Sequence, residues 1–129
     1  MQLEARKPVW RSISAFYLDT ELDAGEIAGI VATFEQSGCS LPELKKIDLY
    51  EVFPVLQGNL TAPAGAWNGF DDDWLFQLCE ENYQRRLQWQ HRLKCRFWNA
   101  FSYWLRRDYW RAVEKKWSAS DQQTAQNLP

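Results

Sequence analysis

The sequence contains few of the residues on which enzymatic and metal chemistry depend. Its 129 residues include a single histidine, His91, and three cysteines that lie far apart, Cys39, Cys79 and Cys95. An odd number of widely spaced cysteines argues against a disulfide framework and against a structural zinc site. Neither a Gly-rich phosphate loop nor a Gly-x-Ser-x-Gly elbow is present. We therefore expect no catalytic residue, no metal and no cofactor.

Long apolar segments are lacking as well. The longest one, over residues 27–34, is interrupted by Gly29 and Thr33. It is far shorter than the about 18 apolar residues that a membrane span needs. The N-terminal residues 1–8 include two basic residues but no apolar stretch after them, so they do not resemble a signal peptide. Together with the cysteine usage, these absences predict a cytoplasmic protein without a membrane partner.

The sequence does contain many aromatic residues and an uneven distribution of charge. Aromatic residues make up 16% of the chain, and the net charge is only -2. Residues 1–80 have five basic and thirteen acidic side chains, whereas residues 81–129 have ten basic and four acidic ones. Either the two halves fold against each other and their charges compensate, or one half presents a charged face to a partner.

Helical spacing of apolar residues characterises the N-terminal half. We predict a first helix at 8–18, because Pro8 fits the first turn of a helix. A second helix is predicted at 23–36. Asp23, with a glutamate three residues later, forms a capping-box pattern there, and Gly38 suits the end of this helix. No segment shows the alternation that is typical of a strand.

A third helix is predicted at 41–52, with Ser40 as its N-cap. Pro54 should limit this helix, because the residue before a proline avoids the helical region. Residues 54–70 form the only long loop, which we expect to pack on the core through its two large aromatic residues, Trp67 and Phe70.

The segment from Asp71 to residue 117 has no proline and no glycine. It is either one long helix capped by Asp71, or two helices with a break near residues 90–100. We therefore predict an all-α, single-domain helical bundle over residues 1–129. It should have four to five helices, a long or broken C-terminal helix, and frayed ends at 1–7 and 118–129.

Apolar residues recur every four positions in the C-terminal part, at Leu93, Phe97, Phe101, Leu105, Tyr109, Val113 and Trp117. A row with this spacing winds around a helix, because an α-helix has 3.6 residues per turn. We expect Phe97 and Phe101 to pack in the core, and Trp110 and Trp117 to be exposed where the row has turned away. An apolar helix of this kind is either core or an interface, including one between two copies of the chain.

Three segments resemble a family of small uncharacterised bacterial proteins of about this length. They are Pro8–Trp10 with Phe16–Leu22, then Tyr50–Val55, then Gly65–Asp71 with Trp74–Leu75. The resemblance covers about residues 8–80 and supplies no catalytic residues. It implies a bacterial, mainly helical protein. By analogy with other small bacterial proteins of this kind, it also suggests an immunity or antitoxin role.

We therefore expect a non-catalytic binding protein, most specifically one that neutralises a cognate toxin by direct contact. An acidic inhibitor facing a basic toxin associates fast and in a salt-sensitive manner. The expected partner-binding residues are four carboxylates near the start of the second helix and two exposed tryptophans, namely Asp19, Glu21, Asp23, Glu26, Trp110 and Trp117.

Two alternatives belong to other functional classes. The first is a nucleic-acid-associated protein that uses the basic, aromatic C-terminal helix, because cations beside stacking rings are what a single-stranded nucleic-acid site needs. The acidic N-terminal half and the absence of a recognised motif argue against it. The second is a small enzyme that uses Asp19, Glu21 or Glu51. His91 and Cys95 share a helix face, but two ligands do not make a metal site.

Overall fold

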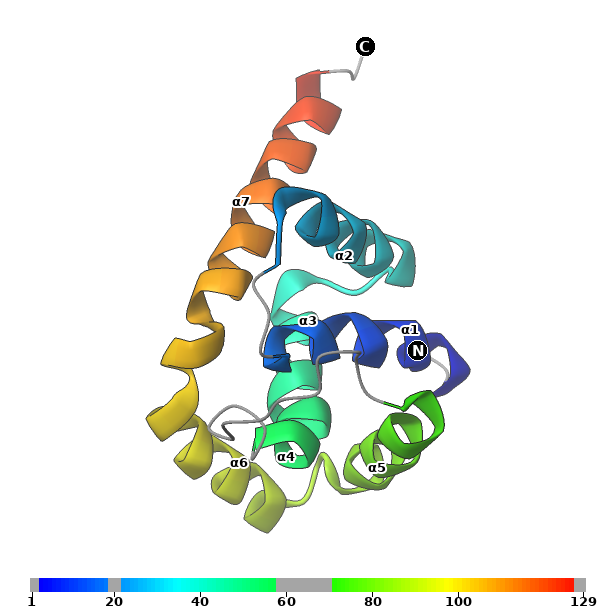
Figure 1. The fold of residues 1–129 in the computed structure, drawn as a ribbon, viewed down its shortest axis with the longest axis vertical. Coiled ribbons are helices and arrows are strands. Elements are labelled where there is room, and N and C mark those ends of the chain that lie inside the picture. The colour runs from blue at the N-terminus through cyan, green and yellow to red at the C-terminus, as the bar shows by residue number, and fades with distance from the viewer. Residues whose placement is uncertain (1–2, 19–21, 58–70, 127–129) are drawn as a thin grey trace.

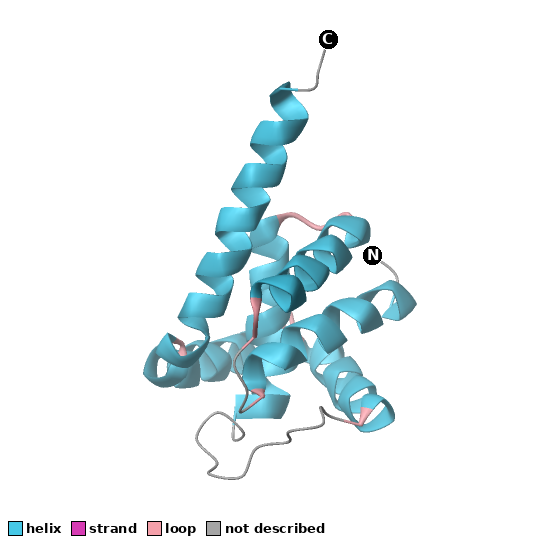
Figure 2. Ribbon diagram, turned by 45° about the horizontal axis from the view of Figure 1, so that its top comes forward, coloured by secondary structure: helices cyan, strands magenta, loops and turns pink. Residues whose placement is uncertain are grey.

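The computed structural model describes residues 3–18, 22–57 and 71–126, with side chains up to residue 117. All regular elements in these ranges are helical (Figures 1 and 2). In chain order they are α1 (Leu3–Ser14), the 3₁₀ turn η1 (Ala15–Tyr17), α2 (Ala24–Ser37), α3 (Leu41–Ile47), the π-helical turn η2 (Asp48–Val52), α4 (Phe53–Leu56), α5 (Asp72–Arg85), α6 (Trp89–Ser102) and α7 (Trp104–Gln126).

The predicted all-α class is confirmed, but the number of helices is higher than predicted. Within the described ranges, six helices have seven or more residues, whereas four to five were expected. The additional helix arises in the C-terminal half, which is divided twice instead of once. The first helix begins at Leu3 and the last ends at Gln126, so parts of the two segments expected to fray are helical.

Local capping signals set the helix ends that the sequence predicts. The Asp23 carboxylate accepts a hydrogen bond from the backbone N–H of Glu26 at 2.8 Å, and the Glu26 carboxylate accepts one from the N–H of Asp23 at 3.4 Å. Gly38 ends α2 in the left-handed region, with a φ of 76°. Ser40 and Asp71 accept the third backbone N–H of α3 and α5, respectively. These ends depend only on neighbours three residues away.

The two prolines do not act as predicted. Pro8 lies inside α1 because this helix begins at Leu3 and not at residue 8. Pro54 does not end the third helix, since the helical path continues from α3 through η2 into α4. In an ordinary α-helix a proline ring clashes with the carbonyl four residues earlier. The wider turn η2, which ends two residues before Pro54, accommodates the proline.

In the C-terminal half, the helix is interrupted before and after residues 90–100, the range in which a break was predicted. The break expected near residues 90–100 is wrong, because α6 is continuous there. Side-chain contacts hold the two bends in the absence of proline and glycine. At the first bend, Arg92 Nε donates to the backbone carbonyl of Arg86 at 2.9 Å. At the second bend, which is at Tyr103, Arg106 turns into the protein interior.

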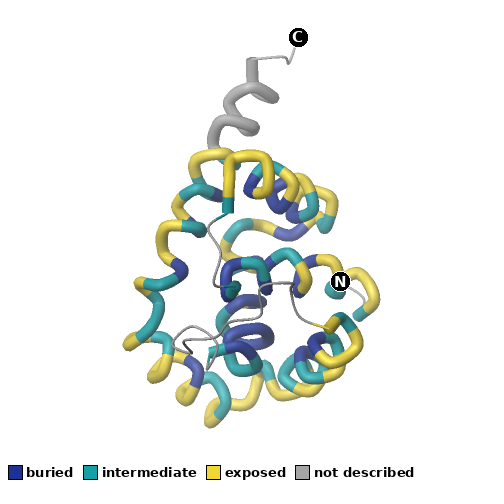
Figure 3. Tube along the Cα trace, in the orientation of Figure 1, coloured by how far each residue is buried: buried dark blue, intermediate teal, exposed yellow. Residues whose placement is uncertain are grey.

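The hydrophobic core lies between α1, α2, the α3–η2–α4 path, α5 and α7. α7 runs along one side of the body, and its C-terminal part extends past α2 (Figure 1). Among the described side chains, α6 supplies none to this core cluster, although the helix is rich in apolar residues. Much of the α6 trace is coloured as exposed (Figure 3). α6 is therefore attached to the body by other means.

Two further findings concern segments singled out by the sequence. Of the predicted loop 54–70, the structure describes only residues 54–57, which are helical, and Trp67 and Phe70 lie outside the described residues. None of the described helices combines the length and the apolar character needed to cross a lipid bilayer.

Candidate functional site

The π-helical turn η2 lies at the centre of the molecule. It packs against α1, α5 and α6 in addition to the two helices that it joins. Two of its carboxylates, Asp48 and Glu51, are almost completely buried. A buried charge is costly unless it is paired and hydrogen-bonded. The partners of these two carboxylates therefore identify the segments that η2 holds in place.

Asp48 joins η1 and α7. Arg106 donates from Nε and Nη2 to Asp48 Oδ2 at 3.1 and 3.0 Å, and Trp110 Nε1 donates to the same oxygen at 2.9 Å. The Tyr17 hydroxyl donates to Oδ1. Burial lowers the pKa of Arg106, but Asp48, together with Tyr17 and Tyr103, outweighs this effect and the pKa is raised overall. Burial, followed by the Asp48 charge, raises the pKa of Tyr17. The guanidinium stays charged and the phenol stays neutral, as a structural network requires.

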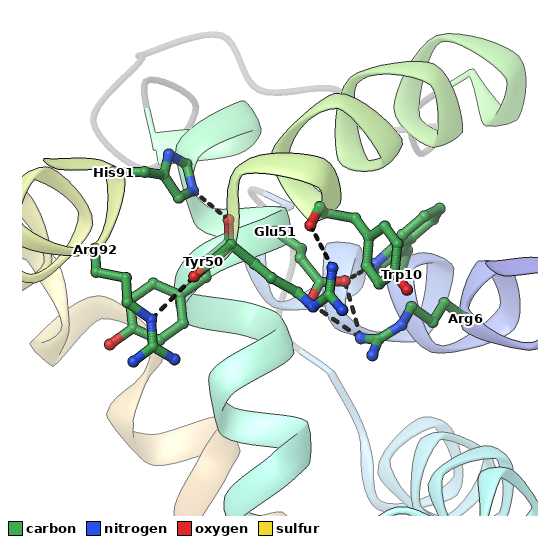
Figure 4. Close-up of polar contacts among 8 residues, drawn as sticks. Arg6, Trp10, Tyr50, Glu51, His91 and Arg92 are labelled. Atoms are coloured by element: carbon green, nitrogen blue, oxygen red, sulfur yellow. Dashed lines mark hydrogen bonds and ion pairs between the residues drawn. The ribbon is translucent and has the colours of Figure 1, made fainter. Parts of the chain in front are cut away.

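Glu51 joins η2 to α1. Arg6 Nη1 donates to its two oxygens at 3.1 and 3.0 Å, and Trp10 Nε1 donates at 3.0 Å, as Figure 4 shows. Burial raises the pKa of Glu51, while the Arg6 charge opposes this rise. From the sequence, Glu51 was a candidate acid for an enzyme. Its engagement by these donors favours a structural role.

α6 faces the body with its polar side. His91 Nε2 donates to the backbone carbonyl of Tyr50 at 2.8 Å (Figure 4). In an α-helix this carbonyl would pair with the N–H of residue 54, which proline lacks. Arg96 Nε donates to the Tyr50 hydroxyl at 3.0 Å, and Asn99 Oδ1 accepts from Arg106 Nη2 at 2.8 Å. Polar contacts to η2 and α7 thus hold α6 in place.

The opposite side of α6, with the first residue of α7, presents apolar side chains to solvent. We call these residues the aromatic face; they are Trp89, Leu93, Phe97, Trp98, Phe101 and Trp104. Each is between 48% and 69% exposed. The Phe97 ring meets the rings of Trp98 and Phe101 edge to face, with centroids 5.5 and 5.2 Å apart. Exposed apolar patches of this kind mark interaction sites on soluble proteins.

The burial predicted for the C-terminal aromatic row is wrong in its direction. Phe97 and Phe101 are exposed, whereas Trp110 is only 1% exposed. The Trp110 ring packs against Phe16 at 5.3 Å and Phe34 at 5.9 Å, and its N–H satisfies Asp48. The apolar pattern alone does not distinguish a core from an interface. The polar groups of η2 decide which side of the helix is buried.

The other predicted partner-binding residues have different positions. Trp117 is partly buried against the core, so its expected exposure is not observed in full. Asp23 and Glu26 are exposed and form the capping box of α2. Asp19 and Glu21 lie outside the described residues. The structure does not bring Trp110 and Trp117 together with Asp23 and Glu26 into one exposed site.

His91 and Cys95 do share a face of α6, as the sequence indicated. Cys95 Sγ lies 3.5 Å from His91 Nε2, but this ring nitrogen already bonds to the Tyr50 carbonyl. Burial raises the pKa of Cys95 to about 11, so its thiol stays protonated near neutral pH. Both line a cavity of about 310 Å³ that also includes Glu81. Within the part of the chain that the structure describes, no group of three or more potential metal ligands is found.

The part of the sequence that carries the aromatic face is rich in positive charge. The sequence has no acidic residue between Glu81 and Asp108, but it has seven basic residues there. Lys94 and Arg96 are exposed on α6 itself. A sequence signal for this arrangement exists in the polar row His91, Cys95 and Asn99, which has the same four-residue spacing as the apolar row. Without the buried groups of η2, nothing in the sequence identifies the polar row as the inward one.

Comparisons with known proteins gave one match. The model of a family described as Domain of unknown function (DUF7079) matches residues 4–116. The match includes α6 and the part of α7 that carries Trp110. Neither a curated protein nor a solved structure matched the chain.

Proposed function

We propose that this chain, which belongs to the DUF7079 family, is a non-catalytic binding protein that docks a protein partner on the aromatic face of α6. One observation carries the proposal: α6 packs on the body through polar residues and leaves its apolar side in solvent. In a surface helix of a globular protein, the apolar side normally faces the core. The reverse orientation is favourable if a partner covers the apolar side.

The partner surface that fits is an apolar groove bordered by carboxylates. Phe97 and Trp98 precede Phe101 by four and three positions, and intervals of three and four residues are those of the anchors in helix-in-groove recognition. The exposed cations Lys94 and Arg96 border these residues on α6. Charge complementarity therefore favours an acidic rim on the partner.

Two observations favour a protein partner over single-stranded nucleic acid. Base stacking uses a free ring face. In the aromatic face, however, the edge-to-face contacts of Phe97 with Trp98 and Phe101 cover part of the ring surface. Leu93 lies in the same row and offers no ring for stacking. Edge-to-face rings together with an aliphatic side chain are instead suited to packing in a protein groove.

The specific form of this proposal is an immunity or antitoxin role, in which the chain neutralises a cognate toxin by direct contact. The sequence predicted this contact at the acidic residues near α2 and at Trp110 and Trp117. We now place it on the aromatic face, since Asp23 and Glu26 already serve the cap of α2 and Trp110 is buried. The toxin would then present the acidic-rimmed groove described above.

The test compares the wild type with the double variant Phe97→Gln/Phe101→Gln as immobilised baits for proteins encoded beside its gene. Both residues are exposed, so each substitution should change the free energy of unfolding by no more than about 0.5 kcal/mol. We expect the wild type to retain an acidic protein that is released by salt. A Lys115→Gln/Lys116→Gln control should retain the same protein, whereas the Phe97→Gln/Phe101→Gln variant should not. In cells, the wild type but not the double variant should relieve growth arrest caused by that protein.

Equal retention by all three baits would show that the aromatic face is not the contact. Recovery of nucleic acid in place of protein would favour the nucleic-acid-associated alternative. A chain that sediments as a dimer, with a monomeric double variant, would assign the face to a second copy.

A further inference from the structure

A second cavity, separate from the aromatic face, lies between α1, α3, η2 and the turn that joins α5 to α6. Its volume is about 250 Å³. Four cationic and two acidic side chains line it, which leaves two positive charges in excess; the cations are Arg6, Lys46, Arg86 and Arg92. One of the carboxylates, Glu51, is already bonded to Arg6 and Trp10. Within the described part of the chain, the other three cations form no ion pair at salt-bridge distance.

Aromatic rings and backbone carbonyls orient two of these arginines. Arg86 lies 3.8 Å over the Tyr83 ring, and its Nη1 donates to the Tyr83 carbonyl at 2.8 Å. Arg92 lies 4.5 Å over the Tyr50 ring, and its Nε donates to the Arg86 carbonyl at 2.9 Å. Figure 4 shows Arg92 beside Tyr50, and Arg6 on the other side of Glu51. Because these contacts hold the guanidinium groups, binding an anion costs little further ordering.

Several donors of the cavity have no partner among the described residues. Arg6 Nε is buried and makes no hydrogen bond. In the described residues, the Arg86 side chain donates hydrogen bonds only from Nη1, and the Arg92 side chain only from Nε. A buried donor without a partner is costly. Oriented and unused guanidinium donors are suited to oxyanions, which they bind through paired N–H groups.

We propose that this cavity binds a small ligand through a phosphate monoester dianion. The dianion matches the two excess positive charges, and its oxygens provide acceptors for the unused donors of Arg86 and Arg92. The cavity is smaller than the about 300–1,000 Å³ of pockets for drug-sized ligands, so the ligand is small. This site is independent of the partner surface proposed above, since it uses the opposite, body-facing flank of α6.

The direct test is an NMR titration of the ¹⁵N-labelled chain of 129 residues with inorganic phosphate and with glycerol phosphate. Sodium chloride at matched ionic strength serves as the reference, and acetate tests a singly charged oxyanion. We expect saturable shifts of the Nε–Hε signals of Arg86 and Arg6, whose Nε atoms are unpaired, and none for Arg107 and Arg111. Both phosphate compounds should bind more tightly than acetate. Saturation by glycerol phosphate alone would identify an ester as the ligand, and saturation by both would identify the shared phosphate group.

Two variants locate the site. Lys46→Gln changes an exposed side chain and should weaken phosphate binding about fivefold, whereas Arg92→Gln should weaken it at least about tenfold. Lys115→Gln, on α7 and outside the cavity, should leave the affinity unchanged. If Arg92→Gln lowers the unfolding midpoint, Lys46→Gln alone decides the result. Shifts that follow ionic strength only, or an equal loss in Lys115→Gln, would overturn the proposal.

Discussion

At the scale of single residues, two carboxylates three positions apart hold the molecule together. Asp48 binds η1 and α7, and Glu51 binds α1. Both lie on the π-helical turn that precedes Pro54. From the sequence, Glu51 was expected to be a partly buried acid, whereas no role was predicted for Asp48. A lone aspartate in a helix is usually solvated, so its burial depends on distant partners such as Arg106, 58 positions away.

Removing the Asp48 charge should destabilise the fold strongly. In Asp48→Asn, the buried Arg106 loses its counter-ion, and breaking such a pair costs about 3–5 kcal/mol. Urea unfolding followed by circular dichroism measures this loss. The matched control is Asp72→Asn, which breaks the exposed pair with Arg11 and should cost no more than about 1 kcal/mol. Equal losses in the two variants would contradict a structural role for the Asp48 network.

At the scale of elements, the orientation of α6 is the feature that carries the proposed function. Its inward residues bond to groups on η2 and α7, and its outward residues include the aromatic face. The bend at Tyr103 changes the exposed side, so that the apolar row is exposed on α6 and partly or fully buried on α7. The same four-residue apolar pattern thus lies at the surface in α6 and packs against the core in α7.

Truncating one aromatic residue from each helix should have unequal effects on stability. Trp110→Ala removes a buried ring and should cost about 3–5 kcal/mol of unfolding free energy. Phe101→Ala removes a mostly exposed ring and should change stability by no more than about 0.5 kcal/mol. Chemical denaturation of both variants and the wild type gives the comparison. A large loss from Phe101→Ala, with a small one from Trp110→Ala, would mean that α6 packs its apolar side inward.

At the scale of the whole molecule, the charge asymmetry of the sequence has two separate outcomes. Part of it is compensated inside the fold, since the buried Asp48 of the acidic first half pairs with Arg106 of the basic second half. The remaining cations are concentrated on and beside α6, where no acidic residue follows Glu81 until Asp108. The fold therefore shows compensation at Asp48 and Arg106, and the exposed cations are the charged face that we propose for a partner.

The distribution of these cations predicts how salt affects association. Two copies that meet through the aromatic face would bring Lys94 and Arg96 of one close to the same residues of the other. Any self-association should therefore increase between about 0.05 M and about 0.5 M salt, because screening removes the repulsion. Binding of an acidic-rimmed partner should decrease over the same range. Sedimentation velocity of the chain alone and with its partner measures both. A dimer that dissociates as salt rises would contradict the like-charge arrangement.

The sequence alone determined the helical class and those helix ends that depend on nearby residues. The caps at Asp23, Ser40 and Asp71 and the stop at Gly38 involve hydrogen bonds over a few positions, so they can be recognised without a fold. Only the tertiary structure decided which side of α6 faces the body. Its anchor His91 bonds to a carbonyl 41 positions away. Apolar periodicity shows that a helix has an apolar side, but burial of that side depends on the groups that the rest of the chain places against it. Here those groups are polar, so the apolar side is left in solvent.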